Sequence, residues 1–449
     1  MAIVSGIRNY FELERFQTSI TTEIIAGLST YLSLAYIFIV NPSILSQVGI
    51  DPKSALFATA VVASLSTLAM GIWANLPFAV APGLTMSSYL AFVVCKKMGL
   101  TWQQGLAAVF MSGLLCVILT ALPVRQAVID SIPAGLKRAI TVTIGIFVAT
   151  IGLFLSKILV FTPGGMMDFS ALDIAHFTSP LAAVMGLGLV TAAVLGWRRL
   201  HFPAGMIVAI LLASFLYHKL IPPHELAPDY SGNALASLGK LDFSGLFHSG
   251  FWIPVIVFFV LDFFEGIGEF IGMTSNTTIQ DKDGNIHNMK QGLWIDGFGT
   301  IGGSIFGTSS LIIFVESAVG IKAGGRTGLT AVVCAILMML SAVASFYFAP
   351  ILSWFPAQAV AGVLVYVGYL LLSSAAEAQK KTIGSSTLDY GVMAVMGLIS
   401  FATFSLDKSL SFGFWAYFAL SLIPGRAGKP AWWLGSIAAA LTAAIAFSA

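Results

Sequence analysis

The sequence predicts an all-α polytopic membrane protein, and its composition and the length of its apolar stretches lead to that prediction. Of the 449 residues, 57% are hydrophobic and only 9% are charged. Soluble domains contain about 25% charged residues, so this chain lies far outside their range. About 20 helical residues cross the hydrocarbon core of a bilayer, and apolar stretches of roughly that length recur along the chain. We therefore expect one bundle of membrane-spanning helices.

The apolar stretches fall into two groups of seven, separated by one long polar segment. The first group lies at approximately 22–42, 54–74, 79–95, 104–122, 136–156, 179–197 and 203–220. The polar segment runs from about His218 to Ser249. The second group lies at approximately 251–272, 291–306, 309–321, 327–349, 356–374, 388–423 (a broken stretch) and 430–448. An odd number of spans per half makes the second half enter the membrane from the opposite side, so we expect two inverted seven-span repeats.

The distribution of basic residues predicts the orientation of the chain. With the N-terminus in the cytoplasm, more lysine and arginine residues fall in inner loops than in outer loops, and an excess of positive charge marks the cytoplasmic side. The first residues, MAIVSGIRNYFELERFQTS, lack the apolar region and cleavage site of a signal peptide. We expect a multi-pass protein of the cell inner membrane, with both termini cytoplasmic and no leader removed.

Several classes of function are disfavoured by the residues present. The basic residues behind the formal charge of +2 are scattered, which indicates no nucleic-acid surface. Cys95, Cys116 and Cys334 lie in or beside apolar stretches without CxxC spacing, so we interpret them as small core residues. The histidines show no HExxH spacing, and the glycine-rich segment 299–310 lacks the lysine of a phosphate loop. We expect neither an enzyme nor a bound metal or cofactor.

One apolar stretch, from Trp252 to Gly272, carries three carboxylates. Asp262, Glu265 and Glu269 are spaced i, i+3 and i+7, which places them on one side of a helix. An ionised carboxylate near the bilayer centre costs at least about 2.5 kcal/mol, so this side of the helix cannot face lipid. The stretch therefore predicts a cavity that is lined by protein or filled with water.

Glu316 is a fourth carboxylate within an apolar stretch, and we expect it to join the same site. Buried neighbouring carboxylates bind and release protons near neutral pH, and they accept paired N–H donors such as those of a flat heterocycle. No lysine or arginine lies in the two stretches that carry these carboxylates, which disfavours an anionic substrate. Two alternatives stay open: Asp262 has either a structural or a functional role, and Glu269 is either a proton carrier or a solvated residue near a helix end.

Two apolar stretches are interrupted at corresponding places, third in each half. Residues 78–88, FAVAPGLTMSS, contain a Pro-Gly pair, and residues 302–320, GGSIFGTSSLIIFVESAVG, begin with Gly, Thr and Ser. Interrupted spans at matching positions indicate a binding site near the middle of the membrane. The freed backbone groups need partners there, which a polar substrate or the facing extended segment would supply. The alternative is a pair of ordinary kinked helices.

Four segments carry a resemblance to a known family. They are TEIIAGLSTYLSLAYIFIVNPSIL (22–45), AVAPGL (79–84), DFFEGIGEFIG (262–272) and, within 307–333, GTSS followed by VESAVGIKAGGRTGLTAVV. Over nearly its whole length the chain resembles the nucleobase-cation symporter 2 family, in its AzgA-like purine permease branch. The resemblance implies a core domain of spans 1–4 and 8–11, a gate domain of spans 5–7 and 12–14, and short antiparallel strands in spans 3 and 10. It also implies proton-coupled uptake of adenine, guanine or hypoxanthine.

The resemblance also implies roles for individual residues. It assigns substrate binding to Glu265, Glu316, Ser87, Thr85, Leu84, Ser309, Ser310 and Phe314, and proton coupling to Glu269 or Asp262. The chain has DFFEGIGE where the branch usually has DLFDTxGT, and Ser87 where an asparagine is usual. Apolar residues 311–314 replace a stretch rich in Thr and Tyr. These differences leave fewer hydrogen-bonding groups around the ligand, so the preferred base stays open.

The implied fold divides the chain into domains and names its partners. The N-terminus (1–21) would be cytoplasmic, 22–122 and 251–349 would form the core domain, 123–220 and 350–449 the gate domain, and 221–250 an extracytoplasmic loop. The partners would be a purine nucleobase, a proton rather than sodium, the lipid bilayer and a second copy of the chain in a homodimer.

Two rival functions remain. The first is an uncoupled facilitator, or a symporter of the same fold for a different heterocycle or organic solute. The second is a membrane enzyme acting on a lipid-soluble substrate, but only Thr274 and Ser275 lie close to the acids and no histidine accompanies them.

Overall fold

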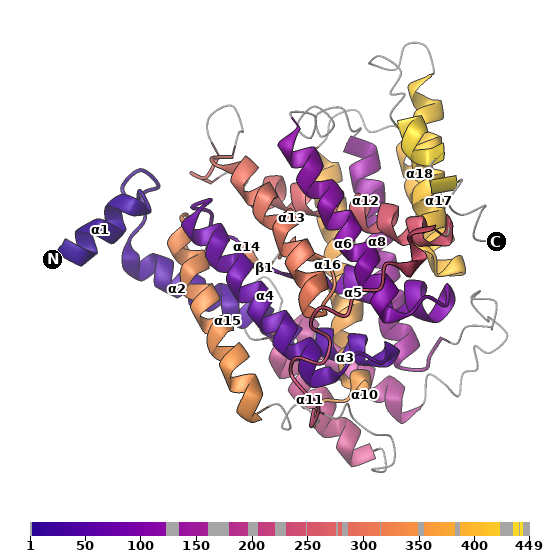
Figure 1. The fold of residues 1–449 in the computed structure, drawn as a ribbon, viewed down its shortest axis with the longest axis horizontal. Helices are drawn as coiled ribbons and strands as arrows, with labels where there is room; N and C mark the ends of the chain where they lie inside the picture. The colour runs from indigo at the N-terminus through magenta and orange to yellow at the C-terminus, as the bar shows by residue number, and fades with distance from the viewer. Residues whose placement is uncertain are drawn as a thin grey trace.

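The chain folds almost entirely into helices (Figure 1). A computed structural model describes residues 2–122, 134–159, 179–195, 205–220, 230–247, 249–274, 277–280, 286–314, 316–348, 354–381, 387–422, 434–439 and 441–442. The helices of its first half are α1 (Ala2–Tyr10), α2 (Ile20–Leu34), α3 (Ile37–Leu45), α4 (Pro52–Ile72), α5 (Leu84–Ser88), α6 (Trp102–Ala121), α8 (Ala134–Leu155), α10 (Pro180–Leu195) and α11 (Gly205–Leu220). Those of its second half are α12 (Ser249–Thr274), α13 (Met289–Phe306), α14 (Ser317–Lys322), α15 (Gly328–Phe348), α16 (Ala357–Lys381), α17 (Thr387–Thr403) and α18 (Leu406–Ser421).

Shorter elements complete the fold. A π-helix, η2 (Tyr89–Lys97), continues from α5, and short 3₁₀ helices are η1 (Ser46–Val48) and η4 (Ser244–Phe247). The strands are β1 (Val80–Pro82) and β2 (Leu311–Ile313). Four helical stretches are long and apolar enough to cross a membrane: Ile20–Val48, Pro52–Ile72, Trp102–Ala121 and Arg138–Leu155. Shorter apolar helices accompany them, as expected of a polytopic membrane protein. The predicted last stretch, 430–448, lies largely outside the described residues.

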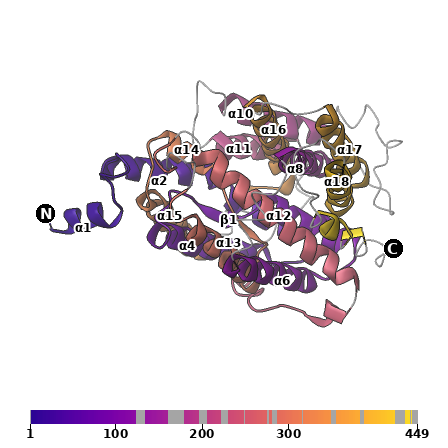
Figure 2. The same cartoon turned by 90° about the horizontal axis from the view of Figure 1, so that it is seen from above.

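The helices pack in two groups, which Figure 2 separates. We call α2, α3, α4, α6, α12, α13, α14 and α15 the first helical group, and α8, α10, α11, α16, α17 and α18 the second helical group. Helices pack mainly within their own group, for example α4 with α15 and α8 with α16. Glycines allow both close crossings: a Cβ on Gly328 would collide with the carbonyl oxygen of Gly71, and one on Gly145 would lie 2.9 Å from that of Gly368.

The two interrupted stretches meet as a small antiparallel sheet, as expected. Strand β1 pairs with β2 so that Val80 lies opposite Ile313, Ala81 opposite Ile312 and Pro82 opposite Leu311. At one end the N–H of Gly83 donates to the Ser310 carbonyl (3.0 Å), and at the other the N–H of Phe314 donates to the Ala79 carbonyl (2.9 Å). The freed backbone groups of one segment are thus satisfied by the other, which is what extended backbone at membrane depth requires.

A threonine supports each strand in the same way. The Thr67 hydroxyl on α4 donates to the Val80 carbonyl (3.0 Å) and accepts from the Val80 N–H (2.9 Å). The Thr300 hydroxyl on α13 donates to the Leu311 carbonyl and accepts from the Leu311 N–H, both at 3.2 Å. Each hydroxyl satisfies the outward-facing polar groups of a strand that has a neighbour on only one side. The two strands therefore have equivalent supports from two different helices.

The first span is broken in the middle, which the sequence reading did not anticipate. Helix α2 ends at Leu34 and α3 begins at Ile37. Pro42 lies inside α3 and has no N–H to donate to the preceding turn. The break brings Tyr36, the N-cap residue of α3, to the end of the sheet near α14, where it contacts Glu316.

Lys97 joins the two helical groups. Its Nζ donates to the carbonyl oxygens of Thr403 (2.6 Å) and Phe404 (3.5 Å), where α17 ends. Phe404 has a left-handed φ of 48°, and its ring lies 4.9 Å from that of Phe147 and 6.4 Å from that of Phe92. A cation is favourable at a helix C-terminus because the last carbonyls there lack helical partners. The end of η2 is thus held against the second helical group by a charged hydrogen bond and ring contacts.

We expect Lys97→Met to loosen this contact, because methionine keeps the aliphatic stem but donates no hydrogen bond. Hydrogen bonds to a charged group contribute about 1.5 to 3 kcal/mol, so opening should become roughly tenfold more frequent. A cysteine at the buried position Ser405 should then react about tenfold faster with a membrane-impermeant maleimide. Lys96→Met is the matched control, since the Lys96 ammonium lies over the Phe92 ring (5.0 Å) on the same η2 helix. Equal labelling rates in both variants would contradict the prediction.

Candidate functional site

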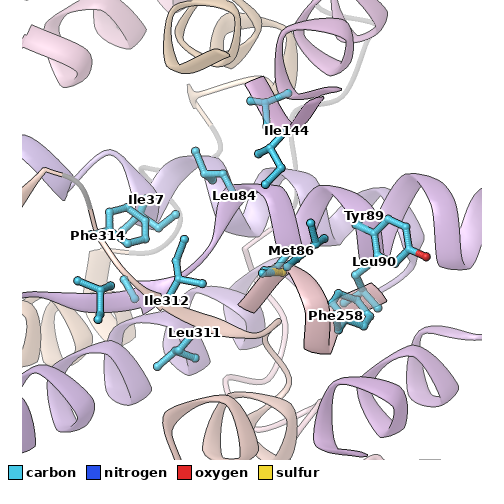
Figure 3. Packing of buried hydrophobic residues seen from close by; sticks show 14 of the residues in the cluster. Ile37, Leu84, Met86, Tyr89, Leu90, Ile144, Phe258, Leu311, Ile312 and Phe314 are labelled. Atoms are coloured by element: carbon cyan, nitrogen blue, oxygen red, sulfur yellow. The ribbon is translucent and has the colours of Figure 1, made fainter. Parts of the chain in front are cut away.

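The two-stranded sheet leads to Glu316 at its α14 end, and a cluster of apolar side chains lies around the sheet. Figure 3 shows Ile37, Leu84, Ile312 and Phe314 in one cluster, with Ile144 of α8 reaching toward Leu84. All five side chains are buried. They come from α3, α5, the β2 segment and the second helical group, so a flat apolar ligand between them would contact both groups.

Glu316 is the charged residue at the α14 end of the sheet. It lies at the N-cap of α14, directly after the β2 segment, and keeps partial accessibility. The Tyr36 hydroxyl donates to Glu316 Oε1 at 2.6 Å. Tyr36 itself is 1% exposed. One carboxylate oxygen is therefore fixed by the tyrosine hydroxyl.

The neighbouring residue, Ser317, fixes this carboxylate segment to β1. Its fully buried hydroxyl accepts a hydrogen bond from the Ala79 N–H (2.9 Å), and its own N–H donates to the Phe314 carbonyl (2.9 Å). Ser317 is thereby held to β1 and to Phe314, which restrains the position of the neighbouring Glu316.

The predicted substrate-binding serines lie at the other end of the sheet and are fully buried. The Ser87 and Ser309 hydroxyls contact each other at 2.5 Å, and Ser87 also donates to Asn41 Oδ1. The Ser310 hydroxyl contacts that of Thr300 at 3.0 Å. These groups bond to the protein, so they position the strand ends. Leu84, a member of the apolar cluster, and Thr85 begin α5 and are each 5% exposed.

Asp262 lies in a third place, between α12, α6 and α13. Its side chain is fully buried, and its Oδ2 accepts a hydrogen bond from Cys116 Sγ (3.3 Å) and lies 3.4 Å from Thr300 Oγ1. Because Thr300 also supports β2, Asp262 lies next to a support of the sheet. This placement favours the structural interpretation of Asp262. Cys116 is buried as expected, but it also donates a weak hydrogen bond, a role that spacing could not reveal.

Glu265 and Glu269 lie on α12, which is one continuous helix of 26 residues. The predicted helix through the three carboxylates is therefore present. The side chains of Glu265 and Glu269 are outside the described residues. Helix α12 packs against β2 and contacts α14, so its backbone passes close to the segment that carries Glu316.

Tyr36, Asn41 and Glu23 are the important polar residues that the sequence reading missed. All three lie in the first span, within the segment quoted for the family resemblance. The signal was an asparagine, a tyrosine and a glutamate in an apolar stretch, where each polar group needs a partner. Among the described residues, no group of three His, Cys, Asp or Glu side chains is placed to hold a metal ion.

Comparison with known proteins decides the family. A family model described as "Permease family" matches residues 21–406, which includes both interrupted stretches and the carboxylates. The chain belongs to this family, the nucleobase-cation symporter 2 family. It is 33% identical to the adenine permease AdeP of Escherichia coli K12 over 426 residues, covering 94% of this chain and 91% of the permease. It is 32% identical to the guanine/hypoxanthine permease PbuO of Bacillus subtilis, covering 91% of this chain and 93% of that protein.

A solved structure of a different transporter has the same fold. The transmembrane domain of the cyanobacterial bicarbonate transporter BicA superimposes with a TM-score of 0.65 at 18% identity, covering 86% of this chain and 97% of that domain. At this identity the likeness concerns the fold alone. The symporter-family member described here is thus a polytopic membrane transporter and not an enzyme, with helices apolar enough to cross a membrane.

Proposed function

We propose that this protein is a secondary active transporter for the proton-coupled uptake of purine nucleobases (adenine, guanine or hypoxanthine) across the inner membrane. One observation carries the proposal: a partly accessible carboxylate, Glu316, accepts from Tyr36 of the apolar core just beyond the sheet where the two interrupted stretches meet. A purine offers a flat apolar ring and N–H donors at its edge, which match apolar walls and a carboxylate acceptor. The names of the relatives AdeP and PbuO support this substrate class.

In this proposal the base lies between the apolar side chains of Leu84 and Phe314. Glu316 and Glu265 accept hydrogen bonds from its N–H groups, and Thr85 of α5 contributes a hydroxyl. Glu269 or Asp262 carries the proton. Asp262 is the less favoured of the two, because Thr300 and Cys116 already lie against its carboxylate. Ser87, Ser309 and Ser310 contribute by shaping the site, since their hydroxyls already have protein partners.

The first helical group is the core domain (22–122 and 251–349) and the second is the gate domain (123–220 and 350–449). Transport follows from movement of one against the other in a fourteen-span fold of two inverted repeats. The equivalent threonine supports of β1 and β2 favour such a repeat, because a two-fold axis through the sheet would exchange Val80 with Leu311. Packing mainly within each group favours rigid movement of each.

The test is uptake of radiolabelled adenine, guanine and hypoxanthine into cells that lack their own purine permeases. We expect accumulation above the external concentration that is abolished when an uncoupler collapses the proton gradient, and unchanged when sodium is replaced by potassium. Cells carrying the empty vector are the control. Uptake that only equilibrates and ignores the uncoupler would identify a facilitator, and no uptake of any purine would point to another heterocycle or organic solute.

A further inference from the structure

A buried amide on α3 has no role in the proposed contacts with substrate. Asn41 is fully buried. Its Nδ2 donates to the hydroxyls of Thr59 (2.7 Å) and Thr308 (2.9 Å), and its Oδ1 accepts from the Ser87 hydroxyl. Thr59 lies on α4, Ser87 on α5 and Thr308 just before β2. One side chain therefore joins α3 to three other segments at the α5 end of the sheet.

The donor and acceptor of each hydrogen bond in this network can be assigned. The assignment requires an amide side chain at position 41. The Thr59 hydroxyl donates its single hydrogen to the Ala55 carbonyl (2.6 Å), so toward Asn41 it can only accept. The group facing Thr59 must be a donor, which fixes Nδ2 there and Oδ1 toward Ser87. Ser87 then uses its hydrogen on Asn41, so Ser309 donates to Ser87. A carboxylate or an apolar side chain at position 41 would leave buried groups unsatisfied.

The same short helix also contacts the opposite end of the sheet. Tyr36, at the N-cap of α3, holds Glu316, and Asn41 lies five residues further along. Five residues of helix measure about 7.5 Å along the axis. The carboxylate end and the α5 end are thus tied to two points on one buried, rigid helix.

We infer that Asn41 is a positioning residue that sets the separation between α5 and Glu316, and thereby which nucleobase the site accepts. The inference rests on the proposed function, since it concerns the site between these two ends. Asn41 acts through Ser87 and Thr308 and does not touch the substrate. Loss of its donors releases Thr59 on α4 and Thr308 just before β2, so that the strand leading to Glu316 can shift relative to α5.

The test is the Asn41→Asp variant, which has the same size but at least one donor fewer in either protonation state. Kd values for adenine, guanine and hypoxanthine are measured on purified protein by ligand-induced thermal shift and equilibrium binding. We expect binding of the preferred base to weaken about tenfold, and the ratios of the Kd values between bases to change. Thr308→Val, which removes one acceptor while keeping the shape, should change the ratios in the same direction by a smaller factor.

Ser43→Ala is the matched control, because Ser43 is buried on the same helix and donates to the Ile39 carbonyl (2.7 Å) outside the network. It should lower Tm without changing the Kd ratios. A lower Tm with unchanged ratios in both Asn41→Asp and Thr308→Val would overturn the inference and leave the proposed function standing. Absence of nucleobase binding in the wild type and in Ser43→Ala would instead overturn the proposed function, and the inference with it.

Discussion

Glu316→Gln is expected to reduce purine uptake on the order of 100-fold while leaving the protein folded in the membrane. The substitution keeps the shape of the side chain but removes the negative charge that accepts from Tyr36 and, in our proposal, from the base. A hydrogen bond to a charged group contributes about 1.5 to 3 kcal/mol, and two such bonds are weakened at once.

The measurement is initial uptake of radiolabelled base at equal amounts of membrane-inserted protein, together with the Kd of purified protein. Glu14→Gln is the control, because it makes the same chemical change on an exposed residue of the N-terminal segment. Tyr36→Phe should give an intermediate loss, since it removes one partner of the carboxylate and keeps the charge. If a folded Glu316→Gln protein took up purines at the wild-type rate, Glu316 would not be part of the substrate site and the proposal would be wrong.

Glu23→Ala is expected to produce the largest loss of stability. Glu23 is fully buried at the start of α2 and accepts hydrogen bonds at the N-terminus of α15. Its carboxylate accepts from the N–H groups of Arg326 (2.9 Å), Thr327 (3.3 Å) and Thr330 (3.2 Å), and from the Thr330 hydroxyl (2.5 Å). The first N–H groups of a helix have no partners within the helix, and they favour a negative charge.

Alanine at position 23 would leave these buried donors without an acceptor, at a cost of about 3 kcal/mol. We expect a lower Tm of the detergent-purified protein and a lower yield from membranes. Glu23→Gln, which keeps one carbonyl acceptor, should fall between wild type and alanine, and Glu14→Ala should match wild type. A wild-type Tm for Glu23→Ala would show that Asn75, which accepts from the Gly328 N–H at 2.7 Å, is enough to cap α15.

Much of the fold could be predicted from local patterns. Long apolar stretches gave helices such as α4 and α6, because the bilayer sets how many helical residues a span needs. The Pro-Gly pair in 78–88 and the Gly, Thr and Ser residues before 311 marked the two places where the helix could not continue. The break at Ala35 and Tyr36 carries no such residue, and tertiary contacts rather than local propensity place it there.

The candidate site divides in the same way. The sequence identified Glu316 and the helix bearing Asp262 because a carboxylate in an apolar stretch must be functional or bonded. It placed Asp262 and Glu316 in one site, and the structure adds Cys116 and Thr300 beside Asp262 and Tyr36 bonded to Glu316. The spacing of residues along a helix predicts which of them lie on the same side of it. It does not predict which neighbouring helix supplies their hydrogen-bond partners.

The sequence by itself determined that this chain lies in a membrane, where most of its helices run, that the third span of each half is interrupted, and that Glu316 and the acids of α12 need partners. Each of these follows from solvation, since a bilayer forces apolar side chains outward and satisfied polar groups inward at every position. The tertiary structure alone decided the pairing, because Tyr36 and Glu316 are separated by 280 residues along the chain and Asn41 and Thr308 by 267. Directional hydrogen bonds need atoms within about 3 Å, and only the packing of the whole bundle brings such distant residues that close.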